Sequence, residues 1–99
     1  MTSEQDRDRV LSVIAKRIEA RRSELKEDDE EWTQHAIAEL AEVDPKQFGK
    51  IENGEAAPRI TTLIQIAGAL GISPAELIAG LRWVPGENRG FGHIEYEEK

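Results

Sequence analysis

The sequence predicts an all-α fold of five helices with a short C-terminal extension, and three observations support this. Apolar residues recur at spacings of three and four in several separate segments. Residues that cap helices (Ser, Thr, Asp) stand just before these segments, and glycines stand just after some of them. Alternation typical of a strand is weak and occurs only near the C-terminus. A chain of 99 residues is long enough for one domain with a modest core.

The first predicted helix runs from about Glu4 to Leu25. Ser3 and Asp6 form a plausible capping box at its start, and apolar residues recur along it at helical spacing: Val10, Leu11, Ile14, Ile18 and Leu25. The charged run K-E-D-D-E-E (26–31) that follows is typical of a solvated loop or a helix end. Trp32 restores the apolar pattern and is expected to fill a gap in the core.

The segment 33–54 predicts two short helices joined by a sharp turn. Thr33 can cap a helix over 34–40, and residues 41–44 make the turn, with Val43 filling the crevice between the helices. Asp44 caps a second helix over 45–52, with Pro45 at its first position and Gln47 as the second half of a capping-box-like pair. Asn53 and Gly54 end it. This layout is that of a helix-turn-helix unit, which can offer one helix to a DNA groove.

Two further helices and an extension complete the prediction. The first spans about 60–70 and stops at Gly71, and the second opens with the box S-P-A-E (73–76) and continues to about Gly80, with Leu77, Ile78 and Leu81 facing inward. We therefore expect a helix-turn-helix domain over 1–81 and an extension over 82–99. In the extension, 83–86 is expected to be an extended piece and a turn, and F-G-H-I-E-Y (91–96) one strand. The sequence offers no second strand candidate, so this strand is expected to be either disordered or, preferably, paired with its copy in a second subunit.

Charge and composition limit the possible functions. The net charge is −7, and residues 23–31 carry six acidic residues against one lysine, so most of the excess lies in one segment. There is no cysteine, His35 and His93 have no companion ligands at metal spacing, and no apolar run approaches a membrane span. No catalytic constellation or phosphate-binding glycine loop is found. We expect a cytoplasmic protein that is not an enzyme and uses no metal or cofactor.

Several segments together resemble the Cro/phage-repressor (Xre-type) helix-turn-helix DNA-binding family. They are R-I-E-A-R-R (17–22), Q-x-x-I-A (34–38), I-E-N-G (51–54), Pro58, L-I-Q-I-A-G-A-L-G-I (63–72) and S-P-A-E-L (73–77). The resemblance covers about two-thirds of the chain. It implies a compact five-helix bundle of the lambda-repressor-like type, usually a homodimer that binds a pseudo-palindromic operator in double-stranded DNA.

The resemblance also implies roles for individual residues. Gln34 matches the glutamine that contacts the DNA backbone or a neighbouring base, and Asn53 a position that commonly holds a phosphate. The positions that face base edges in the major groove are Pro45, Lys46, Gln47 and Lys50. Arg22 and Glu52 match a charged pair that ties the first helix to the recognition helix. From its position alone, Arg59 is a further candidate phosphate contact.

Three features depart from the family pattern. Glu42 occupies a turn position that is usually glycine, so it is either left-handed, at a cost of about 1 kcal/mol, or the turn takes another form. An acidic insertion (26–31) precedes the motif, and Pro45 replaces a residue that often reads DNA. Two functions therefore stay open. The first is a sequence-specific transcriptional regulator, most simply a repressor. The alternative is an antitoxin-like or adaptor module that uses the same fold to bind a protein partner.

Overall fold

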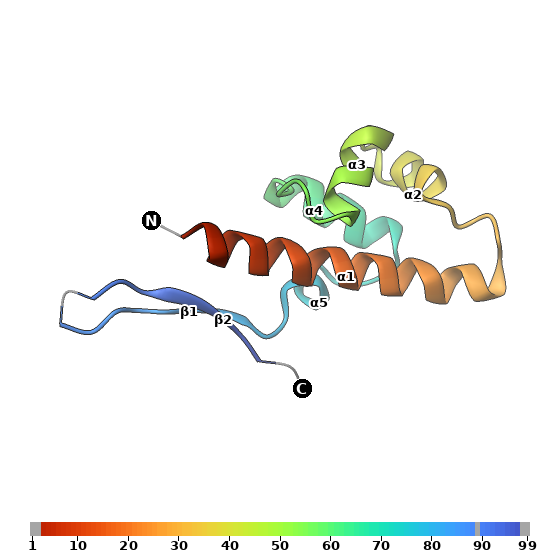
Figure 1. The fold of residues 1–99 in the computed structure, drawn as a ribbon. Helices are drawn as coiled ribbons and strands as arrows, with labels where there is room; N and C mark the ends of the chain where they lie inside the picture. The colour runs from red at the N-terminus through yellow and green to blue at the C-terminus, as the bar shows by residue number, and fades with distance from the viewer. Residues whose placement is uncertain (1–2, 89, 98–99) are drawn as a thin grey trace.

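The computed structural model describes residues 3–88 and 90–97, and this part of the chain is mostly helical (Figure 1). It contains five helices followed by one small antiparallel sheet. In order these are α1 (Glu4–Asp28), α2 (Gln34–Ala41), α3 (Pro45–Glu52), α4 (Ile60–Ala69), α5 (Pro74–Ile78), β1 (Leu81–Val84) and β2 (His93–Tyr96). The predicted fold class is confirmed. Within the described residues, no helix is both long and apolar enough to cross a bilayer.

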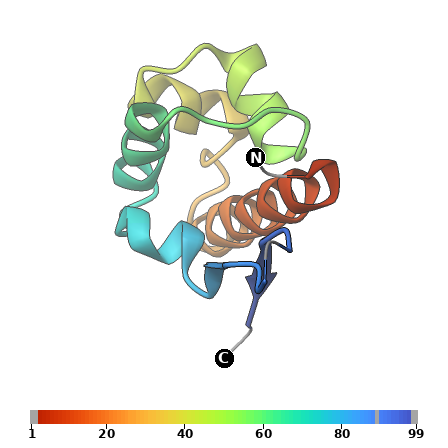
Figure 2. The same ribbon diagram turned by 90° about the vertical axis from the view of Figure 1, so that its left-hand side faces the viewer.

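The long helix α1 forms one wall of the bundle (Figure 2). Ser3 caps its start, because the Ser3 hydroxyl accepts a hydrogen bond from the Asp6 amide at 3.1 Å. The helix continues to Asp28, three residues beyond the predicted end. The prediction treated the whole charged run as a boundary, but its first residues include Lys and Glu, which favour helix and can stay solvated on the exposed surface.

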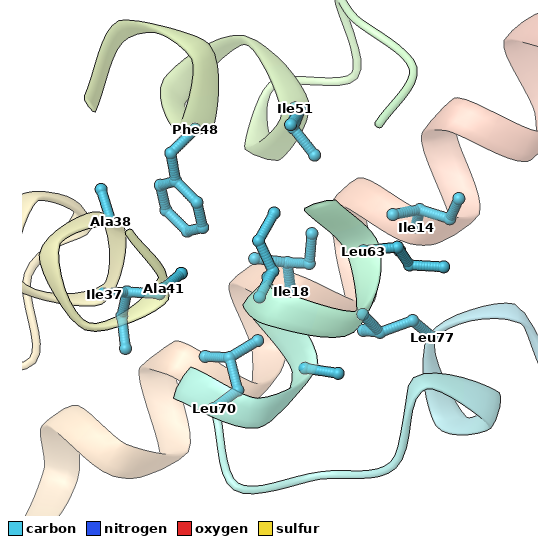
Figure 3. Close-up of a cluster of buried hydrophobic side chains, with 12 residues drawn as sticks. Ile14, Ile18, Ile37, Ala38, Ala41, Phe48, Ile51, Leu63, Leu70 and Leu77 are labelled. Atoms are coloured by element: carbon cyan, nitrogen blue, oxygen red, sulfur yellow. The ribbon is translucent and has the colours of Figure 1, made fainter. Parts of the chain in front are cut away.

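The core lies where α1, α2, α3, α4 and α5 meet, and each of them contributes to it. Figure 3 shows Phe48 and Ile51 of α3 pointing toward Ile18 of α1. The largest fully buried side chains are Phe48, Ile18, Ile37, Ile51, Ile66, Leu70 and Leu77. Trp32 and Val43 are partly buried and pack against this cluster, as predicted. The core therefore fixes α3 through one face only, which leaves its other face to solvent.

The end of the bundle differs from the prediction. The capping box at Ser73 is present, since the Glu76 carboxylate accepts from the Ser73 amide at 2.7 Å. However, α5 stops at Ile78 rather than near Gly80, and Gly80 has a positive φ of 88°. Leu77 is buried as predicted, but Ile78 is exposed and Leu81 begins a strand. A helix of five residues has room for only one inward side chain.

The tail strand has a partner in its own chain, so the prediction that no second strand exists was wrong. β2 pairs with β1 in antiparallel register, with Leu81 opposite Tyr96 and Trp83 opposite Ile94. Neither of the two expected states, a disordered strand or a strand paired with a second subunit, is therefore found. The four residues of β1 show little alternation of their own and follow the last helix closely, so their strand character comes mainly from the hairpin.

Side chains of α1 hold the hairpin against the bundle. The Asp6 carboxylate accepts from the Ile94 amide at 3.1 Å, and Arg9 donates to the Ile94 carbonyl at 2.9 Å. Arg17 donates to the Tyr96 hydroxyl at 3.2 Å, and its guanidinium lies 5.3 Å from the Tyr96 ring centroid. The hydrogen bond from Ile94 is the main cause that lowers the pKa of Asp6 below its usual value. The outward edge of β2 is therefore occupied by α1.

Candidate nucleic-acid interface

The turn between α2 and α3 is built around Glu42. The Thr33 hydroxyl accepts from the Ala36 amide at 3.1 Å and caps α2 as predicted. Glu42 ends α2 in the left-handed region, with φ 58° and ψ 42°, so the first of the two alternatives for this turn is correct. The Val43 amide then donates to the Ala38 carbonyl at 2.9 Å, which closes the turn. The backbone thus takes the sharp path that a helix-turn-helix needs, although the residue here is not glycine.

A helix from the other side of the core supports this turn. The Gln65 side-chain amide of α4 donates to the Ala41 carbonyl at 2.9 Å, one residue before Glu42. Carbonyls in the last turn of a helix lack partners within that helix, so this bond satisfies one of them. Sequence reasoning missed this contact because Gln65 has the pattern of an ordinary exposed residue on α4.

The start of α3 is set by Asp44 and Pro45. One carboxylate oxygen of Asp44 accepts from the amides of Lys46 at 2.9 Å and Gln47 at 3.2 Å, and Pro45 follows at the first helical position. Among the described residues, the Gln47 side chain makes no reciprocal bond to Asp44, so only half of the predicted capping box forms. α3 spans Pro45–Glu52 as predicted, and Gly54, with φ 76°, follows its end.

The outward face of α3 carries the polar side chains that the sequence singled out. Pro45, Lys46, Gln47 and Lys50 are exposed, whereas Phe48 and Ile51 face the core. Lys46 and Lys50 are four residues apart and so share a face. Within residues 3–88 and 90–97, no hydrogen bond or ion pair involves the side chain of Lys46, Gln47 or Lys50. The acidic segment of the same chain therefore leaves these groups uncovered.

Gly49 lies between these side chains. A Cβ built at this position would meet no heavy atom within 4 Å, so packing does not require glycine here. The missing side chain leaves the helix backbone open to close approach from outside.

Arg22, Glu52 and Gln34 form one cluster behind the outward face. Arg22 Nε donates to both Glu52 carboxylate oxygens, at 2.8 and 3.1 Å, and Arg22 Nη2 lies 2.8 Å from Oε1. The Gln34 side-chain amide donates to Glu52 Oε2 at 3.2 Å. The side chains of Arg22 and Glu52 are 16% and 3% exposed. This cluster joins the start of α2 and the end of α3 to α1, and the link from Gln34 to Glu52 was not foreseen.

The two remaining candidates lie at helix ends. Asn53 is exposed at the end of α3 and borders a shallow hollow shared with Asp8, Glu19 and Lys16. Arg59 is exposed immediately before α4 and makes no capping bond through its side chain. Acidic neighbours around Asn53 weaken its attraction for phosphate, so Arg59 is electrostatically the better candidate of the two.

Comparison with family models agrees with this geometry. The model described as Helix-turn-helix, of the Cro/C1 (Xre-like) type, matches residues 24–77, which is more than half of the chain. This chain belongs to the Cro/C1-type helix-turn-helix family. The family consists of DNA-binding regulatory domains rather than enzymes. No curated protein and no solved structure matches the chain. The matched segment contains α2, α3 and α4 in full, and it also includes all seven candidate DNA contacts.

Proposed function

We propose that this helix-turn-helix protein is a sequence-specific transcriptional repressor that binds operator DNA as a homodimer in the cytoplasm. The observation that carries the proposal is the outward face of α3, where Lys46, Gln47 and Lys50 are exposed and free of intramolecular partners among the described residues. A helix inserted in the major groove presents such groups to base edges. Lysine can donate to guanine O6 and N7, and glutamine can bind adenine through two hydrogen bonds.

Phosphate contacts would come from the surrounding groups. The amides of Gln34 and His35 at the start of α2 have no partners within that helix and can donate to phosphate, whereas the Ala36 amide already donates to Thr33. Arg59 adds a cation before α4. Gln34 and Asn53 would contribute neutral hydrogen bonds through their side-chain NH2 groups. Gln34 would use its second N–H, because the first already donates to Glu52. Pro45 would fix the start of α3 and contribute only apolar contact.

Few cations serve this surface, and this has a measurable consequence. Lys46, Lys50 and Arg59 provide three cations per protomer, so a dimer neutralises at most about six phosphates and the slope of log K against log salt is about −5 or shallower. Binding to random DNA should consequently be weak. Affinity for random DNA equal to that for the operator at physiological salt would contradict the proposal.

The decisive experiment has two stages. Genomic fragments are first captured with the purified protein and sequenced, which identifies the operator. Binding to that operator is then measured by fluorescence anisotropy for wild type, for the Lys46→Glu/Lys50→Glu variant, and for an Arg7→Glu/Lys26→Glu control. The control makes the same change in net charge at exposed sites on α1. We expect loss of operator binding only in the first variant; unchanged binding there means that α3 does not read DNA.

An antitoxin-like or adaptor role is favoured by one specific observation. Phe91, in the loop between β1 and β2, is 97% exposed, and Trp83 is half-exposed on the same hairpin. Such aromatic side chains are common anchors in protein interfaces. If this role is the main one, the α3 charge reversal will leave partner binding intact, whereas Phe91→Ser will weaken it.

A further inference from the structure

The helix α4 carries no charged residue, although the protein as a whole is highly charged. Charged residues make up 33% of the chain, yet none occurs in Ile60–Ala69. Ile60 and Ile64 on the outer face of α4 are 67% and 50% exposed. Leu40 of α2, which borders the same hollow as Ile64, is 61% exposed. Depletion of charge around exposed aliphatic side chains is the composition of an interface core.

Beside these side chains lies a shallow hollow. It is bordered by Leu40, Ile64, Gln65 and Gly68, among others, and a Cβ added at Gly68 would meet nothing within 4 Å. Ile60, Ile64 and Gly68 follow one another at intervals of four and therefore lie along one side of the helix. Figure 2 shows α4 at the edge of the bundle, away from α1. The face thus has two bulky positions at one end and an empty one at the other.

We propose that α4 pairs antiparallel with α4 of a second copy, about a two-fold axis at Ile64. Ile60 and Gly68 are equally far from Ile64, so the axis places Ile60 of each copy opposite Gly68 of the other. Each bulky side chain then enters the hollow of its twin, while the two Ile64 side chains pack together. This inference rests on the proposed function, which requires a dimer, and it identifies the surface through which the dimer forms.

Charge and symmetry favour a second copy over an unrelated partner. Two copies each bring a net charge of −7, so close approach is favoured where acidic side chains are few. α4 itself has none, and Glu42 is the one acidic residue among those that border the hollow. The spacing of bulky and empty positions along α4 is complementary to itself, as a two-fold interface requires. Ten residues of helix measure only about 15 Å, less than a standard interface needs, so the free dimer is weak.

The α4 face and the DNA-reading face use different residues. Lys46, Gln47 and Lys50 do not border the hollow beside Gly68. Substitutions on one face therefore leave the residues of the other unchanged, so each activity can be tested separately.

A single-cysteine cross-link tests the position of the axis. The natural sequence has no cysteine, so Ile64→Cys introduces the only thiol. On mild oxidation we expect most of this variant to form a disulfide-linked dimer. Ser23→Cys, at an exposed site on α1, is the control and should remain monomeric. Equal cross-linking of the two variants would overturn the proposal.

A charge swap tests the contact by an independent route. Ile64→Glu and Ile64→Lys each place like charges at the axis, and sedimentation equilibrium should show at least tenfold weaker dimerisation for each. An equimolar mixture of the two should recover dimers, because opposite charges then meet. Ser23→Glu is the matched control. Circular dichroism of each variant checks that it remains folded, which we expect at a half-exposed site.

The outcomes separate this proposal from the proposed function. Ile64→Glu should bind a single operator half-site as wild type does and lose its preference for the paired site. If Ile64→Glu dimerises as wild type does, or if wild type is monomeric both free and on the operator, the α4 interface is refuted. Failure of the DNA-binding proposal would appear elsewhere, as an absent effect of Lys46→Glu/Lys50→Glu.

Discussion

Replacing Glu52 by glutamine should cost the protein a large share of its stability. The change keeps the shape of the side chain but removes the negative charge that faces Arg22, whose side chain is only 16% exposed. Breaking a buried pair in this way costs about 3–5 kcal/mol, because the remaining charge stays desolvated and keeps only neutral acceptors such as the Trp32 carbonyl. A domain of this size is stable by about 5–15 kcal/mol in all. The thermal midpoint should fall by about 12 °C or more, at roughly 4–8 °C for each kcal/mol.

The measurement is urea unfolding followed by circular dichroism, with a double-mutant cycle as the internal control. Arg22→Met and Glu52→Gln are measured singly, and Arg22→Met/Glu52→Gln together. The double variant strands no charge, so it should be less destabilised than either single one. If each single substitution costs less than about 1 kcal/mol, the pair behaves as a surface ion pair and the reasoning from burial is wrong.

Three further predictions concern single positions outside this pair. Glu42→Gly should stabilise the protein by up to about 1 kcal/mol in urea unfolding, because glycine adopts the left-handed backbone of this position without strain. The greater entropy of glycine in the unfolded chain offsets part of this gain. Gly49→Ala should also stabilise, by about 0.5–1 kcal/mol, since nothing blocks the methyl group, but it should weaken operator binding measured by anisotropy. The folded-state pKa of Asp6 is lowered, so its contribution is present above about pH 3.9 and is lost as pH falls through the folded pKa. The Ile94 amide resonance should shift in that acidic window in wild type and lose this titration in Asp6→Asn.

The helices of the bundle were predictable because local signals and tertiary packing agree there. Thr33, Asp44 and Ser73 stand where side chains satisfy free amides, and the structure has those bonds. The boundaries of α3 follow from Asp44 and Pro45 at one end and Gly54 at the other. Caps are local in sequence, so one chain suffices to find them.

The hairpin was not predictable because its signals are not local. β1 has only four residues and ends at Val84, and its partner begins at His93. The hydrogen bonds that hold the hairpin come from Asp6, Arg9 and Arg17 of α1. Asp6 and Arg9 are 88 and 85 positions away from Ile94, the residue that they contact. Each of these charged residues has, in sequence, the pattern of a solvated helix face. The hydrogen bond from Gln34 to Glu52 could not be predicted for the same reason, because it depends on how α2 and α3 cross.

Under the proposed function, the charge of this protein makes pairing of two protomers important for choosing a site on DNA. Three proposed cations on each protomer give weak attraction to any phosphate backbone, and the net charge of −7 reduces it further. One copy of α3 offers only Lys46, Gln47 and Lys50 to the bases, which is enough for about three contacts. Two copies held at a fixed distance double these contacts without a second loss of freedom. If both proposals hold, a weak α4 contact suffices, because the operator itself would bring the two copies together. A protein with so little non-specific affinity would then dissociate from sites that match only one half-site.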